Sequence, residues 1–294
     1  MSDFVQQQNS VCDFGSSDSW VVLSPIEQSI KKKIEAVGTP LRDWNINIYR
    51  GVLTGCNEAF IINTEKRDEI LANCQTDDER TRTAELIRPI LRGRDIKRYG
   101  YVDNGLFLIN THNGIRNKLP RIDINDYPAV KTHLDQYWDR ISTRADKGDT
   151  PYNLRNCAYL EDFSKPKIIY PNMTKYMPFV FDNEMYLTNQ KCFIITGKYV
   201  AYLTAFFNSS LFKYCFRDSF PELQGGTREL SKIFFDKIPV YEVSDAQNLQ
   251  FQDAVEDIQK EYTKQKAQRI DSMLFDLYNL SSEERATIGF VEIV

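Results

Sequence analysis

Residues 199–216 are largely apolar, and they predict a helix at the centre of the hydrophobic core. A helix that is apolar on nearly every side has to be covered by other elements of the fold. Three short strand candidates, residues 167–170, 179–181 and 193–195, precede it in the chain. Together these segments indicate an α/β (α+β) fold, with mixed, mainly antiparallel sheets and helices packed against them.

Further helix and strand signals surround this central segment. Ser24 caps a helix that begins at Pro25, and Glu27 completes a capping box. The buried face of this helix is Ile26, Ile30, Ile34 and Val37. Next come a predicted hairpin of strands 45–49 and 59–62 with a polar tip at 54–58, a helix capped by Thr76 and Glu79 that ends or kinks at Pro89, and a strand at 106–109. Later in the chain, Asp126 and Pro128 open a helix that buries Val130, Leu134, Tyr137, Trp138 and Ile141, an exposed loop is predicted at 143–157, and a strand at 234–241. We expect residues 20–243 to form one domain after a flexible polar leader at residues 1–19.

The end of the chain, residues 244–294, predicts a separate helical segment. Apolar residues at positions 251, 255, 258 and 262, resumed at 270, 273, 274 and 277, indicate one long amphipathic helix over 246–278. Ser281 and Glu284 then cap a short final helix. Residues 241–294 hold eleven acidic and five basic residues. An acidic helix is a poor ligand for a polyanion, and it is better suited to packing on the body of the protein or to docking another protein segment.

Basic residues are concentrated in residues 86–121, which we call the basic island. It holds eight Lys or Arg and two acidic residues, although the whole chain of 294 residues has 37 basic and 41 acidic residues and a net charge of −4. Such an island in an acidic protein is typical of a surface that meets a polyanion. The overall charge argues against indiscriminate coating of nucleic acid, so binding has to come from this patch.

Three polar loops accompany the basic island as candidate DNA contacts. Arginine is suited to bidentate contact with phosphate or with the edge of guanine, and Asn and Gln can pair with adenine. The candidate DNA-binding residues are Arg92, Arg94, Lys97 and Arg98 of the island, Thr54 and Asn57 of loop 54–58, Asn172, Lys175 and Tyr176 of loop 172–176, and Gln224, Thr227 and Arg228 of loop 224–228. Alternatively, some of the arginines pair with acidic residues of the preceding helix, Arg88 above all, and the loop residues serve turn chemistry.

Two other classes of protein remain open. Asp95 and Lys97, with Glu85 upstream, loosely fit a Mg²⁺-dependent nuclease, in which two carboxylates hold the metal and a lysine activates water. Asp95 lies among cations, however, so an arginine partner is the better expectation for it. The other class is a protein-interaction module, in which the acidic C-terminal helix docks a partner and the basic island packs internally.

The remaining motifs exclude more than they predict. His112 and His133 cannot build a metal site without carboxylates, and there is no P-loop, dinucleotide-binding or nucleophile-elbow motif. The six cysteines lie far apart without a CxxC pair, which indicates reduced thiols. Without a signal peptide or an apolar run of membrane length, we expect a cytoplasmic protein.

Several strings of the sequence resemble the TaqI-like C-terminal specificity domain, the target-recognition domain of type IIG (Eco57I-like) restriction-modification enzymes and adenine-specific DNA methyltransferases. These strings are residues 20–27, 33–44, 51–62, 90–99, 199–212 and 270–281. The resemblance extends over nearly the whole chain after the leader. It implies sequence-specific recognition of duplex DNA for a methyltransferase or nuclease that lies elsewhere.

The same resemblance implies that the chain itself is not an enzyme. The Asn-Pro-Pro-Tyr-type catalytic motif and the glycine-rich cofactor motif of these methyltransferases are absent from the sequence. We therefore expect either a fragment of a longer polypeptide or a stand-alone specificity subunit, with no cofactor of its own. S-adenosylmethionine and Mg²⁺ are expected only in the catalytic domains of the parent enzyme. The expected partners are double-stranded DNA and those domains, in a prokaryotic cytoplasm and away from membranes.

Overall fold

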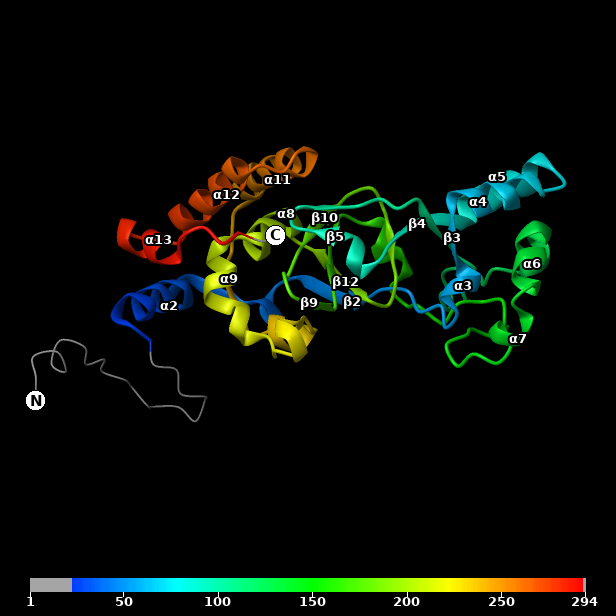
Figure 1. Ribbon diagram of the computed structural model, residues 1–294, viewed down its shortest axis with the longest axis horizontal. Coiled ribbons are helices and arrows are strands. Elements are labelled where there is room, and N and C mark those ends of the chain that lie inside the picture. Colours follow the sequence, from blue (N-terminus) through cyan, green and yellow to red (C-terminus); the bar gives the residue numbers. More distant parts are fainter. Residues whose placement is uncertain (1–22, 293–294) are drawn as a thin grey trace, which may run out of the picture.

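An antiparallel sheet at the middle of the molecule separates two hydrophobic cores (Figure 1). The computed structural model describes residues 23–292. Side chains alternate between the two faces of a sheet. Ile168 and Ile195 accordingly enter the first core, whereas Ile169 and Ile194 enter the second. The strands, in spatial order, are β10 (Val180–Asp182), β8 (Lys167–Pro171), β12 (Cys192–Gly197) and β2 (Ile46–Arg50).

The first core surrounds the predicted central helix. Residues 199–216 form two helices, α8 (Val200–Asn208) and α9 (Ser210–Phe216), and every residue of α8 is buried. The helix is interrupted because Ser209 has an extended backbone, and its hydroxyl caps α9 by accepting a hydrogen bond from the Phe212 amide at 3.0 Å. The central position is therefore confirmed, whereas the prediction of one continuous helix is wrong.

Helices from both ends of the chain cover this core and lie together at one end of the molecule (Figure 1). They are α2 (Pro25–Val37), α11 (Asp245–Lys260), α12 (Lys264–Leu277) and α13 (Ser282–Ile288). The capping box of α2 is confirmed, but Val37 is 46% exposed and does not belong to its buried face. The long helix predicted over 246–278 is also wrong: it breaks after Lys260, and the Thr263 hydroxyl caps the new helix by accepting from the Lys266 amide.

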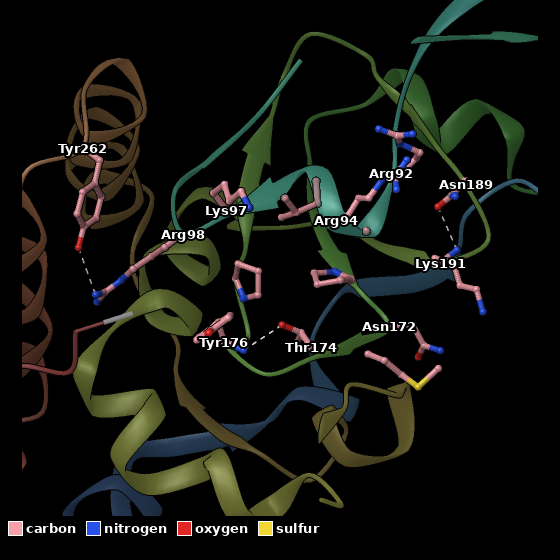
Figure 2. A pocket seen from close by; sticks show the side chains of 15 residues that line it. Arg92, Arg94, Lys97, Arg98, Asn172, Thr174, Tyr176, Asn189, Lys191 and Tyr262 are labelled. Carbon is pink, nitrogen blue, oxygen red and sulfur yellow. Dashed lines mark hydrogen bonds between the residues drawn. The ribbon is translucent and has the colours of Figure 1, made fainter. Parts of the chain in front are cut away.

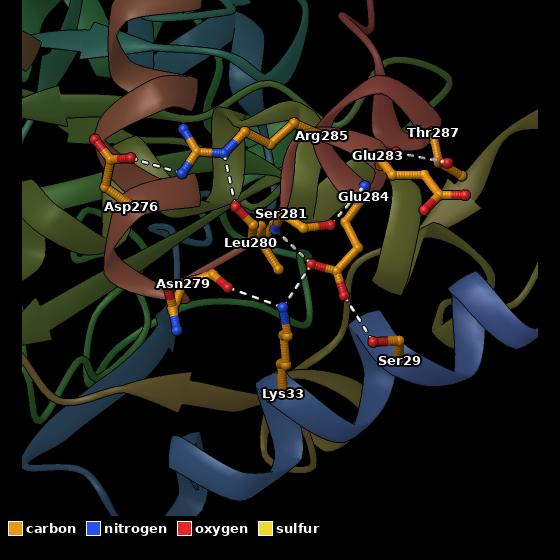
Figure 3. A network of polar contacts seen from close by, with 10 residues as sticks. All are labelled: Ser29, Lys33, Asp276, Asn279, Leu280, Ser281, Glu283, Glu284, Arg285 and Thr287. Carbon is orange, nitrogen blue, oxygen red and sulfur yellow. Dashed lines mark hydrogen bonds and ion pairs between the residues drawn. The ribbon is translucent and has the colours of Figure 1, made fainter.

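A polar network ties α13 to α2 (Figure 3). The carboxylate of Glu284 accepts from the Ser281 amide at 2.6 Å, from the Ser29 hydroxyl at 2.7 Å and from Lys33 Nζ at 2.7 Å. The predicted cap of the final helix is thereby confirmed, and Glu284 also bridges the two ends of the chain. The first core thus contains residues from both sides of the boundary expected at 243/244, and that division stays a prediction.

The second core lies against a four-stranded sheet near the other end of the molecule (Figure 1). Its strands, in spatial order, are β11 (Leu187–Thr188), β4 (Ile87–Leu91), β7 (Leu106–Ile109) and β3 (Ile61–Asn63), of which only β11 and β4 run parallel within residues 23–292. The helices of this end are α3 (Asn57–Phe60), α4 (Thr64–Ala72), α5 (Asp77–Leu86), α6 (Pro128–Asp135) and α7 (Trp138–Ile141). The strand at 106–109 and the Thr76 cap are confirmed, whereas Trp138 is 45% exposed, against prediction.

The predicted hairpin of strands 45–49 and 59–62 does not form. β2 pairs with β12 in the central sheet, and β3 pairs with β7 in the other sheet. Loop 54–58 therefore carries the chain from one sheet to the other instead of closing a hairpin. Two strands that are close in sequence found different partners because each buries its apolar residues against a different sheet.

Short ribbons and turns complete the described structure. The ribbons are β1 (Gly38–Pro40) with β14 (Pro239–Tyr241), β5 (Ile96–Lys97) with β6 (Gly100–Tyr101), and β9 (Met173–Thr174) with β13 (Arg228–Glu229). The short helices are α10 (Lys232–Phe235) and the 3₁₀ turns η1 (Leu41–Asp43), η2 (Gly93–Asp95), η3 (Ile124–Asp126), η4 (Leu160–Ser164), η5 (Arg217–Ser219) and η6 (Gln224–Gly226). The strand predicted over 234–241 is largely wrong, since it begins in α10. Loop 143–157 forms no helix or strand, but Arg144, Asn153 and Leu154 within it are buried.

The mixed α/β class, the mainly antiparallel pairing and the helical C-terminal segment are confirmed. Within residues 23–292, no helix has both the length and the apolar character needed to cross a membrane.

Candidate nucleic-acid interface

A groove of about 840 Å³ brings the basic island and loop 172–176 together. Figure 2 shows Arg94 and Lys97 on one wall, and Asn172, Thr174 and Tyr176 on the other. The described residues that line it, which we call the groove, are Arg92, Gly93, Arg94, Ile96, Lys97, Arg98, Pro171, Asn172, Met173, Thr174, Tyr176, Pro178, Asn189, Lys191 and Tyr262. Two stretches that lie about eighty residues apart in the sequence thus form one site.

The buried carboxylate of Asp95 fixes the backbone of the first wall, at turn η2. This carboxylate is 3% exposed and accepts from the amide, the Nε and the Nη2 of Arg92, at 2.8, 3.0 and 3.0 Å. The Asn104 amide donates to the same carboxylate at 3.0 Å. These bonds fix turn η2, and Arg94 projects from it with its side chain exposed. A buried acid therefore holds a cation at the surface.

The charge of the groove has one sign. Five of its lining residues are Lys or Arg, and none of the described residues that line it is acidic. The side chains of Arg94, Lys97 and Lys191 are exposed, and they form no ion pair with any residue of the described chain. A concave surface with several cations and no acid concentrates positive potential. The groove is therefore fitted to an anionic ligand.

The second wall is a short loop with a fixed backbone. The Asn172 amide donates to Lys191 O at 2.8 Å, and Asn172 O accepts from the Leu230 amide at 2.8 Å. The side-chain oxygen of Asn172 accepts no hydrogen bond from the described residues. Farther along, the Thr174 hydroxyl accepts from the Tyr176 amide at 3.0 Å, and the Tyr176 ring is 49% exposed. The wall therefore presents an amide and an aromatic ring on a hydrogen-bonded backbone.

Loop 224–228 lies beside this wall. Arg228 and Thr174 are paired residues of the β13–β9 ribbon, which places the two loops next to each other. Gln224 is exposed and Thr227 is partly exposed. Gly225 and Gly226 have φ of 74° and 76°, a left-handed backbone that favours glycine. The loop can thus present polar side chains at the rim of the groove.

Loop 54–58 lines a different depression, of about 560 Å³, which we call the second hollow. Its described lining residues are Arg50, Leu53, Thr54, Gly55, Cys56, Asn57, Glu58, Asp146, Arg155 and Gln190. Thr54 is fully buried and its hydroxyl donates to Asn57 Oδ1 at 2.6 Å. Asn57 is exposed. Unlike the groove, the second hollow carries both charge signs, since Arg155 pairs with Asp146 at 2.7 Å.

Two candidate arginines belong to the interior. Arg98 is 8% exposed, and its guanidinium donates to Asn208 O and Val291 O. Arg228 is 6% exposed, and it pairs with Asp218 and Glu222 at 2.8 and 2.9 Å. All three guanidinium nitrogens of Arg98 are bound within the protein, whereas Nε of Arg228 has no partner in the described chain. Burial argues against a DNA contact by either residue, and the contact stays a prediction for both. Arg88 donates to Met185 O and not to an acid of the preceding helix.

The structure also adds residues that the sequence analysis missed. Asn189, Lys191, Met173 and Tyr262 line the groove. The polar string at 189–191 between two apolar strands was a usable signal for the first two. Tyr262 could not have been found, because it lies at the break between α11 and α12, where a continuous helix was expected.

The nuclease alternative finds no support in the described residues. Asp95 is held by Arg92, as expected, and is not free to bind a metal. Within residues 23–292, no group of three or more His, Cys, Asp or Glu side chains is placed to hold a metal ion. Burial lowers the pKa of both His112 and His133, and His133 Nε2 lies 2.9 Å from Ala59 O inside the second core. Neither histidine therefore belongs to a candidate metal site among the described residues.

An α/β scaffold with a basic groove whose described lining contains no acid is typical of a module that binds a polyanion. The sequence model of the TaqI-like C-terminal specificity domain matches residues 88–240, just over half of the chain, and the chain belongs to this family. The matched segment contains every Lys and Arg of the basic island and both walls of the groove, which residues 92–98 and 171–191 contribute. The predicted family is thus confirmed.

Two solved structures were found to be similar to this chain, and the first of them shares its fold. The type IIL restriction-modification enzyme MmeI, solved in complex with DNA, is similar with a TM-score of 0.59 and 10% identity, over 85% of this chain and 35% of that chain. The type IIG restriction endonuclease BpuSI has a TM-score of 0.48 and 12% identity, over 87% of this chain and 33% of that chain. The chain thus spans about a third of the length of each. No curated protein matches its sequence.

Proposed function

We propose that this chain is a DNA target-recognition domain that binds a short duplex sequence in the groove. Arg94, Lys97 and Lys191 bind phosphates, while Asn172 and Tyr176 face the bases. Loops 54–58 and 224–228 supply further contacts at either side, through Asn57, Gln224 and Thr227, and Lys175 adds a cation beside Tyr176. Thr54 is buried and acts through its hydrogen bond to the Asn57 side chain. Phosphate contacts position such a domain and base contacts specify its target.

The observation that carries the proposal is the sign and placement of the groove's charge. A chain with a net charge of −4 concentrates five basic residues in one concave surface without an acid among its described lining. Arg94, Lys97 and Lys191 are exposed there without an acidic partner in the described chain, whereas Arg92 pairs with Asp95 and Arg98 is buried. Maintaining uncompensated cations at close range costs free energy through mutual repulsion. A phosphate backbone bound in the groove offsets this repulsion. Membership of a specificity-domain family points to DNA as the molecule that supplies these phosphates.

The parent protein is proposed to be a site-specific adenine DNA methyltransferase, or a type IIG restriction enzyme that also cleaves DNA. Its catalytic domains would lie in the same or a partner polypeptide, and they would bind S-adenosylmethionine and Mg²⁺. This chain would then hold no cofactor and catalyse no reaction, and it would act in a prokaryotic cytoplasm. The chain covers 35% of the MmeI chain, which supports a part that works beside catalytic domains.

Selection of binding sites from random duplex DNA tests this function. The purified chain is used at two salt concentrations, without Mg²⁺ or methyl donor. Recovery of one short motif at the higher salt is the expected result. Salt-sensitive binding without a motif would mean that specificity needs the catalytic domains. Absence of binding at both salt concentrations contradicts the proposal and favours the protein-interaction module.

A further inference from the structure

A turn at residues 189–191 lies between the groove and the second hollow. Asn189 and Lys191 line the groove, whereas Gln190 lines the second hollow. The turn connects β11 to β12, and it is therefore anchored to both four-stranded sheets. Of the described residues, those of this turn contribute to both depressions, so a ligand that spans the two has to pass over it.

The backbone of the turn is held at each carbonyl. These three oxygens accept hydrogen bonds from the Cys192 amide at 2.9 Å, from Arg50 Nε at 3.1 Å and from the Asn172 amide at 2.8 Å. The side chain of Asn189 adds a further bond by accepting from the Lys191 amide at 3.1 Å (Figure 2). A turn with all of its carbonyls occupied positions its side chains with little freedom.

Close packing holds the same turn from outside. A Cβ atom at Gly51 would lie 2.0 Å from Asn189 O, so only glycine allows this approach. A Cβ atom at Gly93 would lie 3.1 Å from Lys191 O, which brings turn η2 of the basic island against it as well. The turn therefore packs between the end of β2 and turn η2 of the basic island.

Its two long side chains, by contrast, are not committed to the protein. Lys191 is exposed, and its ammonium forms no ion pair or hydrogen bond with a described residue. The amide oxygen of Gln190 is buried and accepts no hydrogen bond from the described residues. A buried polar atom without a partner is costly. Gln190 is partly exposed in the second hollow, so rotation of its amide lets a ligand bound there supply the partner.

We propose that the turn 189–191 is a specificity-determining element, in which Gln190 contacts a base edge and Lys191 binds a neighbouring phosphate. The inference deepens the proposed DNA recognition and rests on it. A glutamine amide both donates and accepts, which suits the adjacent N6 and N7 atoms of adenine in the major groove. Lys191 fixes the strand beside it, so the amide meets one base pair in a defined register.

Two substitutions in the full chain separate these roles. Gln190→Leu keeps the size of the side chain and removes the amide. It is expected to lower the preference at one base pair of the selected motif by roughly 5- to 150-fold, with binding to unrelated DNA unchanged. Lys191→Ala is expected to weaken binding to all sequences alike and to reduce the slope of log affinity against log salt by about 1.

Matched controls exist for both changes. Lys198 lies at the other end of β12 and is exposed, so Lys198→Ala should leave the salt slope unchanged. Gln268 is exposed on α12 and lines neither depression, so Gln268→Leu should leave the motif unchanged. Unfolding in urea checks that all four variants are folded before binding is measured.

The outcomes test the role of the turn separately from DNA recognition by the whole chain. If the wild-type chain selects a motif and both turn variants select the same motif with wild-type affinity and salt slope, the assignment to the turn is wrong while the DNA-recognition function stands. If the wild-type chain binds no DNA, both fall together. A relaxed base pair with Gln190→Leu alone, beside unchanged controls, supports the assignment.

Discussion

Arg98 donates from both Nε and Nη2 to the main-chain carbonyl oxygen of Asn208, at 3.1 and 2.7 Å. Asn208 is the last residue of α8, so the guanidinium lies at the end of the helix where unpaired carbonyls and the helix dipole favour a cation. The remaining Nη1 donates to Val291 O at 2.9 Å. An arginine of the basic island thus joins the buried central helix to the C-terminal part of the chain.

This arrangement predicts that Arg98→Ala lowers stability. The substitution leaves the Asn208 carbonyl buried without its donor and removes a charge-assisted bond, and we expect a loss of about 2–4 kcal/mol in the free energy of unfolding. Urea unfolding measures it, with Arg94→Ala as the control, which should change stability by less than about 0.5 kcal/mol. An Arg98→Ala variant of wild-type stability but reduced DNA affinity would return Arg98 to the DNA-binding surface.

Arg94→Ala should instead act on DNA binding. Its side chain is exposed in the groove and has no partner in the described chain. If Arg94 binds phosphate, its loss weakens binding to all sequences and lowers the salt slope by about 1; if it contacts guanine, its loss relaxes the preference at one base pair by about 1–3 kcal/mol. Titrations of the selected site and of an unrelated duplex at several salt concentrations separate these results. Unchanged affinity for both duplexes would remove Arg94 from the interface.

Acid should weaken the link between α13 and α2. Burial alone would raise the pKa of Glu284, but the hydrogen bonds from Lys33, Ser281 and Ser29 outweigh it and lower the pKa to about 2. A depressed carboxyl pKa stabilises the folded state above the unfolded value, and this contribution is lost as pH falls from about 5 to about 2. Because Lys33 is partly exposed, we expect about 1–2 kcal/mol and not the full amount that the shift implies.

Comparison with Glu284→Gln measures that contribution (Figure 3). The free energy of unfolding of the two proteins should differ most near pH 7, and the difference should shrink as the pH falls toward 3. A difference that stays constant over this range would mean that the carboxylate charge has no role in the link.

The sequence was sufficient for features that depend on neighbouring residues. The Ser24 and Ser281 caps, strand 106–109 and the buried helical segment at 199–216 follow from local patterns. The structure contains them, although the last is divided into α8 and α9. The sequence analysis failed for features that depend on contacts between distant segments, such as strand pairing. β2 ends at Arg50 and β3 begins at Ile61, yet each joins a different sheet, because pairing is determined by which apolar face each strand buries.

The same limit applies to the candidate site. Arg94 and Arg98 occur in one basic string, and nothing in that string distinguishes an exposed cation from a buried one. The difference arises from Asn208 and Val291, which lie 110 and 193 residues away from Arg98 in the sequence. Likewise, Lys191 enters the groove because the Asn172 amide and Gly93 hold its backbone there. Residue type predicted the kind of ligand, whereas tertiary contacts selected the residues.

Two buried lysines offer a final test of what holds the fold together. Lys167, on β8, is fully buried and pairs with Asp182 at 2.5 Å. Lys213, on α9, is 6% exposed, donates to Met177 O and lies over the rings of Phe179 and Phe212, with no acid partner in the described chain. Burial lowers the pKa of both lysines; for Lys167 the Asp182 carboxylate opposes this shift, whereas nearby arginines add to it for Lys213.

The same substitution should therefore change stability by different amounts at the two positions. Lys167→Met leaves the buried Asp182 carboxylate without its ion-pair partner and should lower the free energy of unfolding by about 3–5 kcal/mol. Lys213→Met removes a desolvated amine and leaves only the Met177 carbonyl without its donor, so stability should fall by no more than about 1 kcal/mol or should rise. Urea unfolding of both variants at pH 7 measures the contrast. Equal losses would show that Lys213 contributes through its charge despite its burial, and that the aromatic rings around it supply the compensation that Asp182 supplies to Lys167.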